Sequence, residues 1–166
     1  MIKVEPLNRG NFDEAIELLN IVFAYDTPHS QQAFLSSIDP EVYKKYKATG
    51  EIFGKNLEYF VVKNNDGKVI GTTGFYNKDD DDSDVTWLGW YCVDPDFRGQ
   101  GFGQEILDWT IDEARRRGKK YMRLYTSTRP EEKSANLMYE KNGFKLSNDK
   151  PEPDGDYEIV FREKIL

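Results

Sequence analysis

Three glycines at alternate positions, Gly99, Gly101 and Gly103, could hold an anion. They follow an apolar segment that ends at Val93 and precede a segment with helical periodicity. Because glycine has no side chain, the backbone N–H groups of this turn stay uncovered, and they lie at the positive end of the helix that follows. Arg98 can add a charge-assisted contact. The turn therefore predicts a site for a phosphate or pyrophosphate group.

Two common phosphate-binding motifs fit this turn poorly. A dinucleotide fingerprint that began at Gly99 would need its third glycine at position 104, which is Gln104. A triphosphate-binding P-loop needs glycine and lysine followed by serine or threonine, and the turn lacks that sequence. A structural role also stays open, because glycines let a strand and a helix approach closely.

Hydrophobic periodicity predicts the elements that position this turn. We expect strands at 2–5, 57–64, 68–76, 85–93, 121–126, 144–147 and 157–163, and helices from residue 11, at 30–38 and 39–48, from the turn to 117, and at 130–142. Pro28 should interrupt the first helix, and residues 65–67 (NDG) should join 57–64 and 68–76 in a hairpin. Asp39 should cap the helix at 39–48, and Gly143 should end the helix at 130–142 with Phe144 packing back on it. The segment 85–93 is apolar on both faces and should be a central strand. The strand, crossover helix and strand that end at residue 126 predict two parallel neighbouring strands. The predicted fold class is α/β (α+β), a mixed sheet with helices on both faces, in a single domain covering 1–166.

Composition and charge narrow the classes of partner. The net charge of −7 and the isoelectric point of about 4.9 make nucleic acids and anionic membranes improbable partners. The one basic patch, 115–120, falls at the end of a predicted helix, where cations suit the helix dipole, although contact with an anion stays open. A single cysteine permits no internal disulfide. With no signal peptide or membrane-spanning segment evident, we expect a cytoplasmic protein.

Two segments carry a family resemblance. Residues 93–103 read VDPDFRGQGFG and resemble the acyl-CoA-binding signature of the GNAT superfamily of N-acetyltransferases. Residues 135–144 read ANLMYEKNGF and resemble the helix and turn that this family places after its fifth strand. One predicted helix and one predicted strand separate the two segments, as in the family. Two ordered motifs are more specific than either motif alone, although the first third of the chain carries no family motif.

The resemblance implies a mostly antiparallel central sheet with a splayed parallel pair of central strands, and acetyl-CoA as the acyl-donor cosubstrate without a metal. The pantetheine arm would lie against backbone groups of Tyr91 and Val93, and the glycine turn would hold the pyrophosphate. The implied cofactor-binding residues are Tyr91, Cys92, Val93, Arg98, Gly99, Gln100, Gly101, Phe102, Gly103, Asn136 and Tyr139.

The resemblance also implies direct attack of an amine on the thioester in a ternary complex. A backbone N–H group near Cys92 or Val93 would stabilise the developing oxyanion. Tyr139 would be the catalytic acid that protonates the departing thiolate. Tyr139 could instead be a core tyrosine, and Asn136 could satisfy the first turn of its helix rather than bind pantetheine.

Other chemical groups give weaker signals. Cys92 has no histidine beside it in sequence and is expected to be a buried structural residue rather than a nucleophile. His29 could deprotonate the amine or be an ordinary solvated residue. Glu51, Glu58 and Asp26 are candidate bases by location only. The Asp-rich segment 79–84 could gather a cationic acceptor or simply be a solvated hairpin tip.

The function that follows is transfer of an acetyl group from acetyl-CoA to a primary amine of a small molecule, peptide or protein. The alternative is a non-catalytic acyl-CoA-binding sensor or interaction module, and a nucleotide-binding domain is a third reading. Members of the family often form dimers, so a homodimer stays open. The acceptor should be bound near 23–48, a region whose residues do not indicate which amine it binds.

Overall fold

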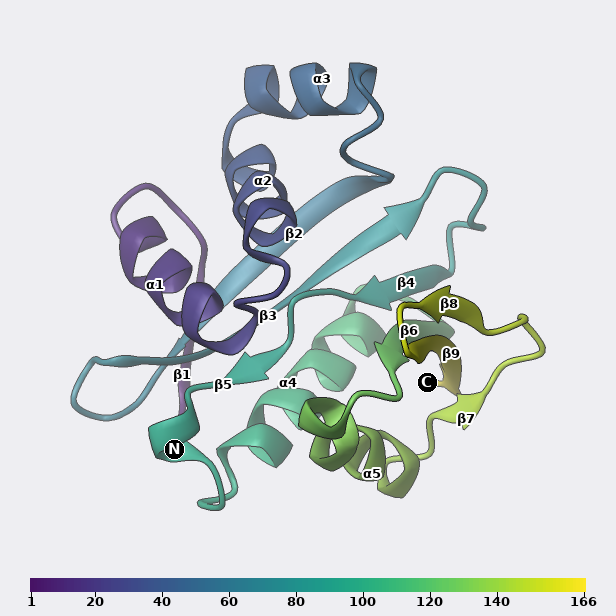
Figure 1. The fold of residues 1–166 in the computed structure, drawn as a ribbon. Helices are drawn as coiled ribbons and strands as arrows, with labels where there is room; N and C mark the ends of the chain where they lie inside the picture. Colours follow the sequence, from purple (N-terminus) through teal and green to yellow (C-terminus); the bar gives the residue numbers. More distant parts are fainter. The chain divides into compact units, whose positions relative to one another are not determined.

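The computed structural model describes the whole chain, Met1–Leu166, except for the side chain of Thr27. The chain forms two compact units. Unit 1 contains Met1–Asp81 and Leu88–Thr110, and unit 2 contains Asp82–Trp87 and Ile111–Leu166. In Figure 1, unit 1 is mostly purple, blue and teal, and unit 2 is mostly green and yellow. The single domain expected for 1–166 stays a prediction.

Unit 1 combines helices with antiparallel strands. Its elements are β1 (Lys3–Pro6), α1 (Phe12–Val22), α2 (Thr27–Ile38), α3 (Pro40–Ala48), β2 (Gly54–Lys63), β3 (Val69–Lys78), β5 (Cys92–Val93) and the 3₁₀ turn η1 (Pro95–Phe97). β2 pairs antiparallel with β1 and β3, and β5 pairs antiparallel with β3. The predicted hairpin between β2 and β3 is confirmed, with Gly67 at φ +81° and the Asn64 side chain accepting from the N–H groups of Asp66 and Lys68.

The alternation of side chains along β2 directs two hydrophobic clusters to opposite faces of the unit 1 strands. Val61 belongs to the cluster formed with Leu18 and Leu19 of α1 and Phe34 of α2. Its neighbour Val62 packs with Ile70 of β3 and Ile106 of α4 (Phe102–Arg116). Helices therefore cover both faces of these strands, as predicted, and α4 covers the same face as the glycine turn that precedes it.

Unit 2 contains the predicted parallel pair. It holds β4 (Val85–Leu88) up to Trp87 and the part of α4 from Ile111 onward. Its other elements are β6 (Tyr121–Ser127), the 3₁₀ turn η2 (Pro130–Glu132), α5 (Lys133–Lys141), β7 (Lys145–Leu146), β8 (Glu152–Asp154) and β9 (Tyr157–Ile165). β4 and β6 are parallel, and β9 pairs antiparallel with β6, β7 and β8. The predicted mixed, mostly antiparallel fold class is confirmed.

The strands β6 and β9 have one buried and one more open face. Met122, Leu124 and Arg162 share the buried face and are at most 6% exposed. Arg123 and Glu163 face each other on the opposite side and form an ion pair of 2.6 Å. An arginine among fully buried apolar residues needs specific partners, and these are described below.

The prediction of one continuous strand over 85–93 is wrong. β4 ends at Leu88, β5 begins at Cys92, and Trp90 between them has φ +48°. A bulky residue in this left-handed region costs free energy and needs support from its surroundings. The support is Thr72, a fully buried residue whose hydroxyl donates to the carbonyl oxygen of Trp90 (2.6 Å). Apolar pattern alone cannot reveal this break, because the residues on both sides of it are buried.

Smaller differences concern element ends. Pro28 does not interrupt the first helix as expected. Helix α1 ends at Val22, and Pro28 lies in the first turn of α2, where its missing N–H group costs nothing. The C-terminal helix starts three residues later than expected, after η2. Strand β8 was missed, because its residues, Glu152–Asp154, are polar and form a short hairpin with β9. Asp39 caps α3 as predicted, and its bond from the Val42 N–H group lowers the carboxyl pKa.

Candidate active site

The segment before the glycine turn is fixed by Asp94. This residue is 8% exposed, and its N–H group donates to the Ile70 carbonyl (2.8 Å). Its carboxylate accepts from the N–H group of Asp96 (2.9 Å) and pairs with Lys68 Nζ (3.1 Å). The carboxylate therefore closes the turn at η1, and the chain leaves β5 in a defined direction.

The glycines of the turn adopt conformations that few other residues tolerate. Gly99 has φ +74° and Gly101 has φ +90°, both in the left-handed region. A Cβ atom at either position would meet no atom within 4 Å, so the space over the turn is open. Helix α4 makes its first i→i−4 bond from Glu105 N to Gly101 O (3.1 Å). The N–H groups of Phe102 and Gly103 precede that bond, which is the arrangement that binds phosphate at helix N-termini.

Tyr91 fastens this turn to the strand side of unit 1. Its hydroxyl donates to the carbonyl oxygen of Gly103 (2.8 Å). Burial raises the pKa of the Tyr91 phenol, so the hydroxyl stays protonated and remains a donor at neutral pH. The sequence predicted only a backbone role for Tyr91; the side-chain bond to the turn was missed.

Arg98 lies at the start of the turn with an exposed side chain. Its Nε donates to the carbonyl oxygen of Val93 (3.2 Å), which holds the guanidinium group beside the glycines. The same bond occupies a lone pair of the Val93 carbonyl, one of the groups expected to meet pantetheine. Nearby, Lys68 Nζ lies 4.6 Å from the centre of the Phe97 ring. The turn thus has cationic side chains on an otherwise acidic chain.

Cys92 has the surroundings of a structural residue. It is 4% exposed, and its sulfur lies 3.2 Å from the Thr72 hydroxyl oxygen. Burial raises the pKa of the Cys92 thiol from 9.0 to about 11, so almost no thiolate exists at neutral pH. A nucleophilic cysteine needs the opposite shift.

Helix α5 carries the second predicted part of the site. Tyr139 is 7% exposed, and its ring packs edge-to-face on Phe144, with 5.8 Å between the ring centres. Gly143 ends the helix at φ +82°, and the Phe144 N–H group donates to the Tyr139 carbonyl (3.0 Å). The predicted glycine cap and its apolar contact are confirmed.

Asn136 is held by partners from its own unit. Its Nδ2 donates to the Ser127 carbonyl (3.0 Å), the Glu132 carbonyl (3.2 Å) and the Thr126 hydroxyl (3.3 Å). Its Oδ1 accepts from Arg162 Nε (3.3 Å). A contact of Asn136 with pantetheine stays a prediction and would have to use the remaining lone pair of Oδ1.

The structure groups the predicted residues into two sets. Those from Tyr91 to Gly103 lie together in unit 1, whereas Asn136 and Tyr139 lie in unit 2. The sequence carries no signal for Arg162 or Glu132, because Arg162 stands beside Glu163 and Lys164 and reads as part of an exposed charged segment.

His29 has a carboxylate partner. Its Nδ1 contacts Asp26 Oδ1 at the start of α2. The N–H group of Asp26 donates to the Phe23 carbonyl (2.8 Å), and the Phe23 ring packs edge-to-face on Trp90, with 5.3 Å between centres. The backbone of Asp26 is therefore tied to Phe23, whose ring contacts the strained Trp90, while the His29 side chain is 65% exposed.

Clustered charges elsewhere pair largely with each other. In the basic patch, the ion pairs are Arg115–Asp112, Arg116–Glu113, Arg117–Glu113 and Lys120–Asp84. In unit 1, Asp79 pairs with Lys47 (2.7 Å). The ion pairs favour the structural interpretation of the basic patch, whereas the role of the Asp-rich segment 79–84 stays a prediction.

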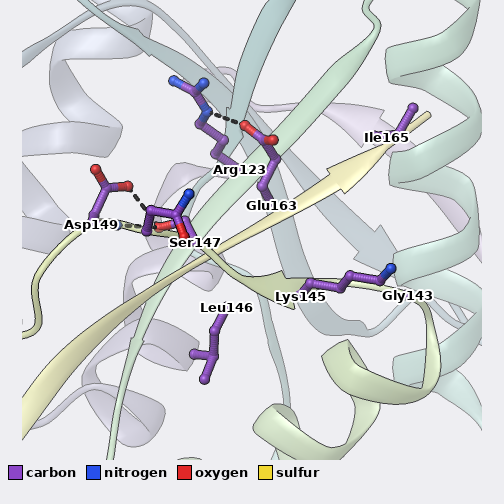
Figure 2. Close-up of a pocket in the computed structure, with 9 residues that line it drawn as sticks. Arg123, Gly143, Lys145, Leu146, Ser147, Asp149, Glu163 and Ile165 are labelled. Atoms are coloured by element: carbon purple, nitrogen blue, oxygen red, sulfur yellow. Dashed lines mark hydrogen bonds and ion pairs between the residues drawn. The ribbon is translucent and has the colours of Figure 1, made fainter.

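Unit 2 also has a surface cavity of about 570 Å³ beside β7 (Figure 2). Its lining residues are Arg123, Gly143, Lys145, Leu146, Ser147, Asn148, Asp149, Glu163 and Ile165. Figure 2 shows the Arg123–Glu163 pair and the Ser147–Asp149 hydrogen bond at its wall. This cavity contains none of the predicted site residues.

Among the residues that the structure describes, no three histidine, cysteine, aspartate or glutamate side chains lie together as metal ligands would. No helix within that same part of the chain has both the length and the apolar character of a membrane-crossing segment.

The sequence model of the acetyltransferase (GNAT) family matches residues 21–144, which includes the glycine turn and α5. The chain belongs to this family, whose activity is acetyl transfer. No curated protein matches the chain.

Solved structures share the fold at low sequence identity. A protein assigned to the GNAT family from Desulfovibrio desulfuricans has a TM-score of 0.71 at 12% identity, with 99% of each chain covered. A GNAT family acetyltransferase from Elizabethkingia anophelis with acetyl-CoA bound has a TM-score of 0.61 at 19% identity, covering 99% of this chain and 98% of its own. The ribosomal-protein-S18-alanine N-acetyltransferase of Escherichia coli has a TM-score of 0.63 at 19% identity, covering 98% and 92%.

Proposed function

We propose that this protein transfers an acetyl group from acetyl-CoA to a primary amine by direct attack in a ternary complex. The observation that carries the proposal is the glycine turn, where left-handed Gly99 and Gly101 open the space before the N-terminus of α4. Backbone N–H groups and Arg98 would hold the pyrophosphate there. The acetyl-CoA bound to the E. anophelis relative is consistent with this ligand.

The chain's own groups would supply the proton transfers. Acetyl-CoA brings an activated thioester: the amine nitrogen bonds to the acetyl carbon, and the carbon–sulfur bond breaks. A backbone N–H group near Cys92 or Val93 would stabilise the developing negative charge on oxygen. The Tyr139 hydroxyl would give its proton to the departing sulfur, and the amine would give up its own proton to a base.

We infer that His29 is the best supported base among the candidates. Its Nδ1 contacts the Asp26 carboxylate, an arrangement that orients an imidazole and leaves Nε2 to accept a proton. His29→Gln should lower kcat by about 10-fold or more, whereas Gln31→Glu, at another position of the same helix, should not. Unchanged kcat in His29→Gln would show that His29 is not the base, which would then be water or a carboxylate.

The acceptor amine is proposed only as a class. The E. coli relative is named for alanine of a ribosomal protein, so amines of proteins belong in the test alongside small amines. We also propose a cytoplasmic location, with no nucleic acid, membrane lipid or metal as partner. Measurement of the mass in solution tests whether the protein forms a homodimer.

The experiment that tests the proposal combines calorimetry with a thiol-release screen. Acetyl-CoA should bind, and amines, polyamines, amino acids, aminoglycosides and peptides with free amino-termini should be offered as acceptors. Release of CoA thiol with any acceptor supports the enzyme. Tight binding without turnover over the whole panel supports the non-catalytic module, and absence of binding heat overturns both.

A further inference from the structure

Arg162 of β9 is a buried cation that the proposed chemistry does not use. The residue is 6% exposed and lies beside Leu124 of β6, which is 1% exposed. Burying a guanidinium group is costly unless its donors are satisfied. Each of the three Arg162 nitrogens has a partner, so its neighbours determine where the group points.

The partners of Arg162 form one stripe along α5 and its cap. Nε donates to Asn136 Oδ1 (3.3 Å), Nη2 to Glu140 Oε1 (2.7 Å) and Nη1 to the Phe144 carbonyl (3.3 Å). Residues four apart lie on the same side of a helix, so one planar group holds the first turn, the last turn and the cap together.

A second set of bonds ties the same first turn to the end of β6. Asn136 Nδ2 donates to the Ser127 carbonyl, and the Glu132 carboxylate accepts from the Ser127 N–H group (2.7 Å). Because Arg162 occupies Oδ1, the orientation of the Asn136 amide is set, with Nδ2 toward β6. Arg162 therefore links β9, α5 and β6 through Asn136.

Tyr139 is connected to Arg162 through Phe144. The Phe144 carbonyl is held by Arg162, the Phe144 N–H group donates to the Tyr139 carbonyl, and the Phe144 ring packs on the Tyr139 ring. Phe144 is 1% exposed and has little freedom to move. The orientation of the Tyr139 hydroxyl thus depends on where Arg162 keeps α5 and its cap.

We propose that Arg162 is a positioning residue that sets the orientation of Tyr139 for proton transfer. This inference rests on the proposed role of Tyr139. A displacement of a catalytic group by about 1 Å can cost about 100-fold in rate, which is the scale on which such a residue acts. In Arg162→Met the Glu140 carboxylate loses its ion-pair partner, but its side chain is 55% exposed and water can solvate it, so stability and rate can separate.

The first test compares Arg162→Met with Arg123→Met. Arg123 lies on the opposite face of the same strand pair and is bonded to Glu163 (Figure 2), so its replacement removes a second arginine of this strand pair while Arg162 keeps its bonds to α5. Arg162→Met should lower kcat by about 10- to 100-fold with KM for acetyl-CoA within about twofold, and Arg123→Met should change neither. Unchanged kcat in folded Arg162→Met overturns the proposal. If this variant does not fold, Arg162→Lys replaces it. The same loss of kcat is expected, and unchanged kcat again overturns the proposal.

The second test is a double-mutant cycle with Tyr139→Phe. If Arg162 acts through the hydroxyl of Tyr139, then Arg162→Met should have little further effect on kcat once that hydroxyl is gone. If the fold-loss of kcat in the double variant equals the product of the two single losses, the proposal is overturned, because Arg162 would then act independently of the Tyr139 hydroxyl.

The third test does not depend on turnover. Amide hydrogen exchange of Asn136–Lys141 should be faster in Arg162→Met than in Arg123→Met, since the former loses the bonds from Arg162 to α5. Equal protection in both variants overturns the positioning role. If instead Tyr139→Phe leaves kcat unchanged, the proposed acid role fails, and hydrogen exchange still reports whether Arg162 holds α5.

Discussion

The glycine turn and helix α5 are the two regions with predicted site residues, and they are built in opposite ways. The turn exposes backbone: Gly99 and Gly101 have positive φ angles and open space where side chains would be. The α5 region buries side chains, with Tyr139 at 7% and Arg162 at 6% exposure. In the proposed function, the first would bind acetyl-CoA through backbone groups, whereas the second would restrain the side chain of the catalytic acid. The two regions should therefore respond differently to substitution.

The largest effect should follow removal of one hydroxyl from the α5 region. Tyr139→Phe should lower kcat by about 100-fold or more, because the departing thiolate loses its acid, while acetyl-CoA affinity stays the same. Steady-state kinetics and calorimetry measure the two quantities. Tyr125→Phe, at a half-exposed position of β6, is the control and should keep full activity. Normal turnover in Tyr139→Phe would show that Tyr139 is not the catalytic acid.

A smaller effect, now on binding, should follow from filling the turn. In Gly101→Ala, the methyl group occupies the open space at φ +90°, so affinity for acetyl-CoA should fall by about 10-fold or more. The strained conformation should also lower the free energy of unfolding by about 1–2 kcal/mol.

Gly118→Ala is the matched control, since Gly118 has φ +73° and the same open space. It should reproduce the loss of stability without the loss of affinity. Equal affinities in the two variants would show that the turn does not bind the cofactor.

The bond from Tyr91 to the turn should make a modest contribution. Tyr91→Phe leaves the Gly103 carbonyl without this donor and should lower the free energy of unfolding by about 1 kcal/mol. Affinity for acetyl-CoA should fall only a few-fold, because the N–H groups of the turn remain. Denaturant unfolding and calorimetry provide the check, and a kcat loss as large as that of Tyr139→Phe would contradict the division between the regions.

A last effect, confined to alkaline pH, should be a pH dependence of stability from Cys92. Between pH 9 and 11 the folded state keeps the thiol proton that the unfolded state releases, so stability falls as pH rises. Thermal unfolding of the wild type over this range should therefore decline more steeply than that of Cys92→Ala. Parallel curves would mean that the thiol is less buried than its 4% exposure indicates.

Sequence reasoning succeeded where structure depends on local rules. The Asp66–Gly67 hairpin, the Asp39 cap and the Gly143 cap each involve residues a few positions apart, and each was correctly predicted. The break at Trp90 was missed, because its support comes from Thr72 on another strand. Apolar runs cannot reveal such a break.

The sequence by itself determined the glycine turn, its helix and the family they indicate, since a phosphate-binding turn uses backbone geometry that adjacent glycines specify. Tertiary structure alone decided the environment of Tyr139, because Arg162 and Phe144 reach it from different elements. It likewise decided that Asn136 is hydrogen-bonded within its own unit. Side-chain networks join residues far apart in the chain, and no local pattern encodes the distances between them.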